Sequence, residues 1–199
     1  MYWTVGQRAV WALARIMALL GGIVLTGLIL LTCVSVVGRG LNGFLNDHVA
    51  QTVMPDFADW ALAQGIGPVL GDVELVEAGM AFVIFAFLPL CQLSGAHARV
   101  DIFTQRLPLG VRRWLAAVTD VVFAVVLVLI AWRLSVGLAE KRHYVETTFM
   151  LQLPVWWAYT ASLAAAAIAG FAGVFVALAR LVEAMKGGDV IDPDGDMAG

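Results

Sequence analysis

Charged side chains are scarce in this chain: of its 199 residues, 14% are charged and 61% are hydrophobic. Globular domains carry about 25% charged residues, so the material for an ordinary water-exposed surface is missing. This shortage excludes a typical soluble protein and predicts an integral membrane protein.

Cysteine and histidine are also rare. Cys33 and Cys91 are expected near opposite faces of a bilayer, which excludes a disulfide between them, and neither has metal-ligand spacing. His48, His97 and His143 all fall in expected loops. We therefore expect no haem or zinc site, no cofactor and no catalytic residue.

Long apolar runs are what the chain has in abundance. A helix needs about 20 apolar residues to cross a hydrocarbon core of about 30 Å. Four runs meet this requirement and predict an all-α protein with four transmembrane helices, at about 12–38, 75–94, 114–139 and 155–182. They form one expected membrane domain over 1–186, with an outer loop at 39–73 and a disordered tail at 187–199. The Ala- and Gly-rich middle of the fourth run, 164–173, suits close helix packing.

The N-terminal run resembles a signal peptide only superficially. Arg8 precedes an apolar stretch, and Leu31-Thr32-Cys33 is faintly similar to a lipoprotein cleavage site. The run is too long, however, and Thr32 is the wrong residue before the cysteine. We expect a retained helix.

The outer loop is acidic, with Asp47, Asp56, Asp59 and Asp72 following Arg39. Pro55-Asp56 favours the start of a short helix, which Gly65 would close. Phe57, Trp60 and Ala61 would share one face of that helix. Two interpretations stay open: an ordinary surface loop, or a helix lying on the membrane or against a partner.

Basic residues near span ends predict the orientation, because they prefer the cytoplasm. Both termini and the loop between spans two and three share one side. That side holds Arg8, Arg15, Arg99, Arg106, Arg112, Arg113, Arg180 and Lys186, against Arg39, Lys141 and Arg142 on the other. We therefore expect both termini in the cytoplasm. Val100, Phe103 and Leu107 then predict a short amphipathic helix on the inner surface.

Charges inside spans cost at least roughly 2.5–3.5 kcal/mol each, so they are expected to pair or to face a partner. We predict that Arg39 pairs with Glu77, which shares a helix face with Glu74, and that Arg15 pairs with Asp120. Arg133 has no equally clear partner. An ion path would need ionisable groups spaced through the bilayer, and the fourth run has none, so structural pairing is favoured.

The order of these features resembles the DctQ-type small membrane subunit of tripartite ATP-independent periplasmic (TRAP) transporters. Arg39 closes span one and Glu77 opens span two. His97-Ala98-Arg99-Val100-Asp101 is similar to the family's G-x-H-I-R-V-D pattern, with Leu107-Pro108 behind it, and Leu153-Pro154 introduces span four. The resemblance covers about 12–182. Ala98 departs from the usual β-branched residue, and the outer loop is longer than usual.

The resemblance implies an accessory scaffold subunit of the bacterial inner membrane. Such a subunit pairs with a large permease subunit that carries substrate and sodium, while a periplasmic solute-binding protein delivers the substrate, commonly an organic acid. The outer loop is a possible contact for that binding protein. We expect structural or interface roles for Arg15, Arg39, Glu74, Glu77, His97, Arg99, Asp101, Asp120, Arg133 and Pro154.

Two other classes were weighed. A four-helix membrane enzyme or electron carrier would need paired histidines or a polar catalytic cluster inside the spans. A self-sufficient small transporter would favour an internal repeat with broken helices, but only span two contains a proline, Pro89. The sequence lacks the features that either alternative requires.

Overall fold

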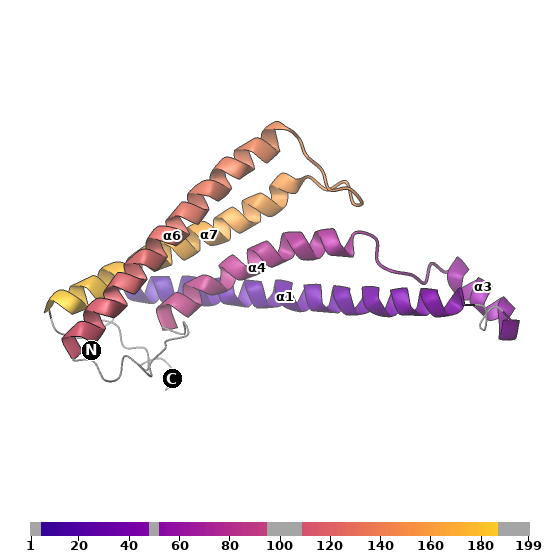
Figure 1. Ribbon diagram of the computed structural model, residues 1–199, viewed down its shortest axis with the longest axis horizontal. Helices are drawn as coiled ribbons and strands as arrows, with labels where there is room; N and C mark the ends of the chain where they lie inside the picture. Colours follow the sequence, from indigo (N-terminus) through magenta and orange to yellow (C-terminus); the bar gives the residue numbers. More distant parts are fainter. Residues whose placement is uncertain (1–4, 48–51, 95–108, 187–199) are drawn as a thin grey trace.

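The computed structural model describes residues 5–47, 52–94 and 109–186. This part of the chain is helical apart from turns and one isolated bridge between Thr147 and Pro154. The helices are α1 (Val5–Leu45), α3 (Pro55–Ala63), α4 (Asp72–Ser94), α6 (Leu109–His143) and α7 (Val155–Lys186). Four of them are long and apolar enough to cross a membrane. The predictions of an all-α fold and of four long apolar helices are confirmed (Figure 1).

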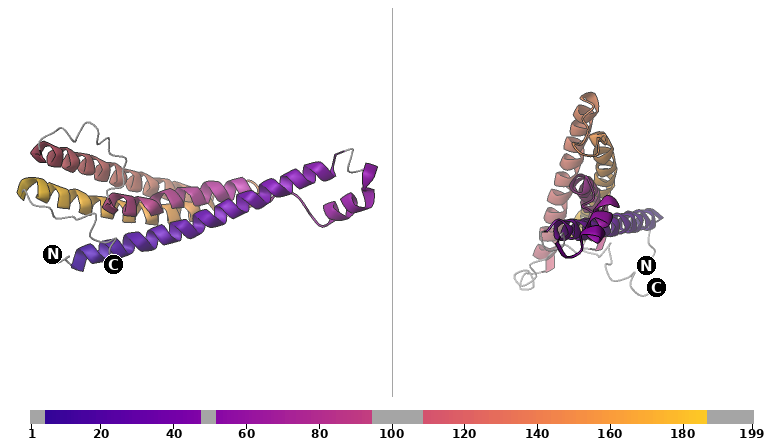
Figure 2. Two further views of the ribbon diagram at one scale, coloured as in Figure 1. Left: turned by 90° about the horizontal axis from the view of Figure 1, so that it is seen from below. Right: turned by 90° about the vertical axis from the view of Figure 1, so that its right-hand side faces the viewer.

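The four long helices form two antiparallel pairs, α1 with α4 and α6 with α7. The pairs join because α4 also packs against α7. They lie closest near the start of α1 and the end of α7, here called the terminal end, and diverge toward the α6–α7 hairpin, here called the hairpin end (Figure 1). The resulting shape is long and narrow, and α6 is an edge helix (Figure 2).

Small side chains form the contacts between the helices. Ala165, Ala166, Ala169 and Ala172 of α7 are all at most 2% exposed. Ala165 packs with Met17 of α1 and Ala86 of α4 at the centre of the bundle. The Ala- and Gly-rich stretch therefore brings three backbones close together, as small residues do in membrane helices.

Helix α1 continues past Gly38-Arg39-Gly40, where the sequence analysis ended it, to Leu45. A glycine inside a helix costs only about 1 kcal/mol, which neighbouring contacts can outweigh. Leu45 is buried against Ala58 and Ala61 of α3, so burial of its side chain favours the extra turns.

The short helix predicted at Pro55 is present as α3, and Gly65 follows it with a left-handed φ of +79°. Its faces differ from the prediction. Ala61 is buried with Ala58, whereas Phe57 and Trp60 are 54% and 58% exposed. Small alanines let α3 pack closely on Leu45 of α1, whereas the two aromatic rings stay exposed.

Several predictions fall outside the described residues. These are the amphipathic surface helix, the His97–Asp101 segment and the C-terminal tail. The cytoplasmic location of the termini also stays a prediction.

Candidate functional site

A polar cluster links α1 to the start of α4 at the hairpin end. The Ser35 hydroxyl donates a hydrogen bond to Asp72 Oδ2 at 2.5 Å, and Arg39 Nη2 lies 3.2 Å from the same oxygen. Asp72 Oδ1 accepts the backbone N–H of Val73 at 2.9 Å. A carboxylate at a helix N-terminus is also favoured by the helix dipole, so Asp72 stabilises both the start of α4 and its contact with α1.

Arg39 pairs with Asp72, whereas Glu77 was the predicted partner. The reason is the register of the antiparallel pair: Gly21 lies beside Ala86, and Ser35 lies beside Asp72. The stretch of α1 from Gly21 to Ser35 therefore lies alongside the stretch of α4 from Ala86 back to Asp72, and the two ends of each stretch are fourteen positions apart. Arg39 is level with the very start of α4, more than a turn beyond the exposed Glu77.

Glu74 links α4 to the hairpin between α6 and α7. Its two carboxylate oxygens accept the backbone N–H groups of Met150 at 2.7 Å and Leu151 at 3.0 Å. Gly71 permits this approach, because it has a φ of +75° and a Cβ there would collide with the Leu151 side chain. Glu74 therefore connects the start of α4 to the hairpin, and its structural role stays a prediction.

The hairpin has its own internal contacts. Lys141 Nζ lies 2.5 Å from Glu146 Oε2, and the N–H of Val155 donates to the Glu146 carbonyl at 3.0 Å. Pro154 forms the bridge with Thr147 and comes directly before the first residue of α7. Pro154 thus lies where the chain turns into the last span.

A second charged cluster lies at the terminal end, where α6 meets α7. Arg180 Nε is 3.8 Å from Asp120 Oδ2, and its Nη1 is 3.0 Å from Glu183 Oε2. The three side chains are only 18%, 17% and 5% exposed. Mostly buried charges of opposite sign stabilise one another, and the two carboxylates share Arg180 as a cation.

Arg15 lies over the Trp11 ring, with its guanidinium carbon 5.7 Å from the ring centroid. Its pairing with Asp120 stays a prediction; the partner of Asp120 that the geometry shows is Arg180. Arg180 and Glu183 were not predicted as a pair, although their spacing of three residues on one helix is a usable signal. Ser35 was not predicted either, because a serine in an apolar helix has no distinctive pattern.

Arg133 is another charge for which a structural or interface role was predicted. It is exposed, and it makes no hydrogen bond or ion pair with any residue in the described ranges. It lies inside the apolar stretch of α6, beside Trp132, which is 63% exposed.

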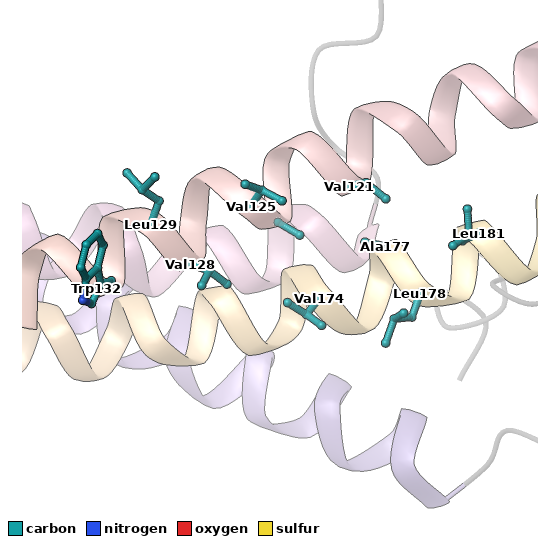
Figure 3. A pocket seen from close by; sticks show the side chains of 10 residues that line it. Val121, Val125, Val128, Leu129, Trp132, Val174, Ala177, Leu178 and Leu181 are labelled. Atoms are coloured by element: carbon teal, nitrogen blue, oxygen red, sulfur yellow. The ribbon is translucent and has the colours of Figure 1, made fainter.

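Large apolar side chains cover the outside of the bundle. On α1 they include Leu19, Ile23 and Leu30, each more than 60% exposed. Between α6 and α7 an open groove of about 610 Å³ runs along the surface (Figure 3). It is lined entirely by apolar side chains: Val121, Ala124, Val125, Val128, Leu129, Trp132, Val174, Ala177, Leu178 and Leu181. Within the described residues, no three His, Cys, Asp or Glu side chains are placed to hold a metal ion.

The charged clusters thus lie toward the two ends of the helices, and the faces between them are apolar. A comparison with protein families identifies the kind of membrane protein that has these features. The model of the DctQ component of tripartite ATP-independent periplasmic transporters matches residues 28–187. The chain belongs to the DctQ family. No curated protein and no solved structure matches it.

Membership makes the chain a multi-pass membrane component of a TRAP transporter. The segment that matches the DctQ model includes both polar clusters, Glu74 and Arg133, whereas Arg15 precedes it. In a DctQ protein these residues are therefore parts of a transporter component.

Proposed function

We propose that this chain is the accessory scaffold subunit of a sodium-coupled, binding-protein-dependent transporter that takes up organic acids across the bacterial inner membrane. It pairs with a large permease subunit and has no catalytic role. The match to the DctQ component over residues 28–187 is the observation that carries this proposal.

The distribution of polar groups supports a scaffold role. The charged clusters at Asp72 and Arg180 join helices of this subunit to each other. The segment of α7 from Val155 to Ala179 is uncharged and packs through small residues. A substrate path needs polar groups spaced through the bilayer, so substrate and sodium are expected to bind in the large subunit.

Reconstitution tests the proposal. The large subunit is placed in liposomes with and without this chain, the binding protein is added outside, and an inward sodium gradient is imposed. Radiolabelled organic acids that raise the Tm of the binding protein serve as probes. We expect uptake only when all three components and sodium are present. Full uptake without this chain, or uptake by this chain alone, would overturn the proposal.

We also propose that α3 contacts the solute-binding protein. Exposed Phe57 and Trp60 have ring centroids 6.0 Å apart, and Asp56 and Asp59 are exposed on the same short helix. Aromatic side chains are enriched in protein interfaces, and the acids disfavour binding to anionic lipid.

We expect that the double variant Trp60→Ala with Asp59→Lys weakens capture of the binding protein by the assembled complex, while complex assembly is unchanged. Undiminished capture would exclude this contact.

A further inference from the structure

Arg133 lies within the apolar span of α6 and has no charged partner in the part of the chain that the structure describes. The longest uncharged run of α6, Val121 to Trp132, has twelve residues and rises about 18 Å. A hydrocarbon core is about 30 Å thick, so α6 cannot cross it without including Asp120 or Arg133. Asp120 is compensated by Arg180. Arg133 has no such partner among the described residues.

The packing of α6 against α7 gives a second measure of depth. Gly173 of α7 lies against Ala124, and Gly170 lies against Val128. Toward the hairpin end, Gly137 lies against Tyr159. This antiparallel register puts Arg133 level with residues near Ala165, close to the middle of the uncharged stretch of α7 from Val155 to Ala179. Arg133 is therefore deep in the membrane by both measures.

The direction of Arg133 is away from the rest of the subunit. Ala124 packs against α7, and the nine residues from Ala124 to Arg133 turn the helix by about two and a half turns. Arg133 thus lies on the opposite face. There it shares a stripe with exposed aliphatic side chains. This α6 stripe consists of Leu115, Val118, Val122, Val126 and Val136, which are 38–57% exposed.

The Arg133 side chain does not reach the membrane surface, where water would solvate its charge. Arg133 is ten residues from His143, about 15 Å along the axis. Side chains on a helix point toward its N-terminus, which in α6 is away from His143. A deep cation among apolar side chains is stabilised by a polar partner at the same depth, and an anion stabilises it most.

Resting on the proposed pairing with a large permease subunit, we propose that the α6 stripe is a docking surface for one of that subunit's transmembrane helices, and that this helix presents a carboxylate to Arg133. The stripe supplies close apolar packing, and Arg133 fixes the register of the two subunits. The planar guanidinium can bind a carboxylate through two parallel hydrogen bonds. Charge complementarity selects this occupant, because an uncharged helix would leave Arg133 uncompensated.

Co-purification of the full chain with its large membrane subunit tests the docking surface. We expect Arg133→Leu to lower recovery of the large subunit about tenfold or more, because a buried charge on the partner loses its counterion. Arg133→Lys keeps the charge but loses the second parallel hydrogen bond, so its recovery is expected to fall between that of the wild type and that of Arg133→Leu. Arg142→Leu is the matched control, since Arg142 is exposed at the hairpin end of the same helix, and its recovery should be unchanged.

Charge reversal then identifies the partner residue. Arg133→Glu is combined with Asp→Lys or Glu→Lys variants at each intramembrane carboxylate of the large subunit. We expect one combination to restore recovery. If none does, the proposed carboxylate is excluded.

Three further outcomes are separable. Wild-type recovery by Arg133→Leu, together with loss of co-purifying phospholipid phosphate, would show a lipid phosphate in place of the carboxylate and overturn the inference. Wild-type recovery with unchanged phosphate would overturn it as well. Absence of the large subunit from the wild-type preparation would overturn the proposed function itself. Circular dichroism and gel filtration of Arg133→Leu alone establish that the variant is folded.

Discussion

Helices α6 and α7 are alike in length and apolarity, yet they occupy opposite environments. Each has a candidate span of 31 residues, but 50% of the most apolar part of α7 is buried within the subunit, against 17% for α6. The difference follows from side-chain size. Alanine and glycine let α7 approach two neighbours, whereas the valines of α6 leave it at the edge with a broad exposed face. Hydrophobicity puts both helices in the membrane, and residue size decides which one forms the core.

The largest expected effect comes from enlarging a core alanine of α7. Ala165 is 0% exposed and contacts Met17 and Ala86. Ala165→Leu should lower the free energy of unfolding of the detergent-solubilised subunit by about 3 kcal/mol, because the helices cannot separate without losing their contacts. Ala164 is the adjacent, exposed residue, so Ala164→Leu should stay within about 0.5 kcal/mol. If both variants lost the same free energy in SDS-induced unfolding, Ala165 would not be more closely packed than Ala164.

The next comparison uses one arginine from each helix. Arg180→Leu removes the cation between Asp120 and Glu183 and should destabilise the isolated subunit by about 2 kcal/mol, since both acids make further contacts that limit the loss. Arg133→Leu should leave that free energy unchanged or raise it, because it removes a charge from the apolar face of α6. Thermal unfolding in detergent measures both. A loss in Arg133→Leu as large as that in Arg180→Leu would mean that Arg133 has a stabilising role within the subunit.

The smallest expected effect concerns the hairpin that joins the two helices. Glu74→Gln removes the carboxylate that accepts the N–H groups of Met150 and Leu151. Amide exchange at these two residues should become faster, while exchange in the middle of α7 stays the same. Glu77→Gln serves as the control, because Glu77 is exposed on the same helix. Unchanged protection in Glu74→Gln would indicate that the hairpin is held by its internal contacts.

Much of this architecture could be predicted from apolar runs alone, because a bilayer demands about 20 apolar residues per helix. The four spans and the short helix at Pro55 follow from such local patterns. The structural role of Glu74 was expected, but its partners were not, because they are backbone N–H groups 76 and 77 residues away.

The pairing of charges depends on helix register, which hydrophobicity does not specify. Arg39 and Glu77 were expected at the outer ends of their spans, but α1 extends beyond Arg39 to Leu45. The contact with Asp72 depends on how Gly21 and Ala86 fit together near the bundle centre. Similarly, nothing local to Asp120 predicts its contact with Arg180, because only the packing of α6 on α7 brings Arg180 near.

Helix α1 has a mechanical consequence that arises from its 41 uninterrupted residues. It is about 60 Å long, roughly twice the thickness of the hydrocarbon core. A rigid rod of that length acts as a lever: a change of 5° in its tilt moves its far end by about 5 Å. Because α3 is packed on that end through Leu45, a small rotation set by the bilayer or by a membrane partner becomes a displacement of the exposed aromatic pair Phe57 and Trp60.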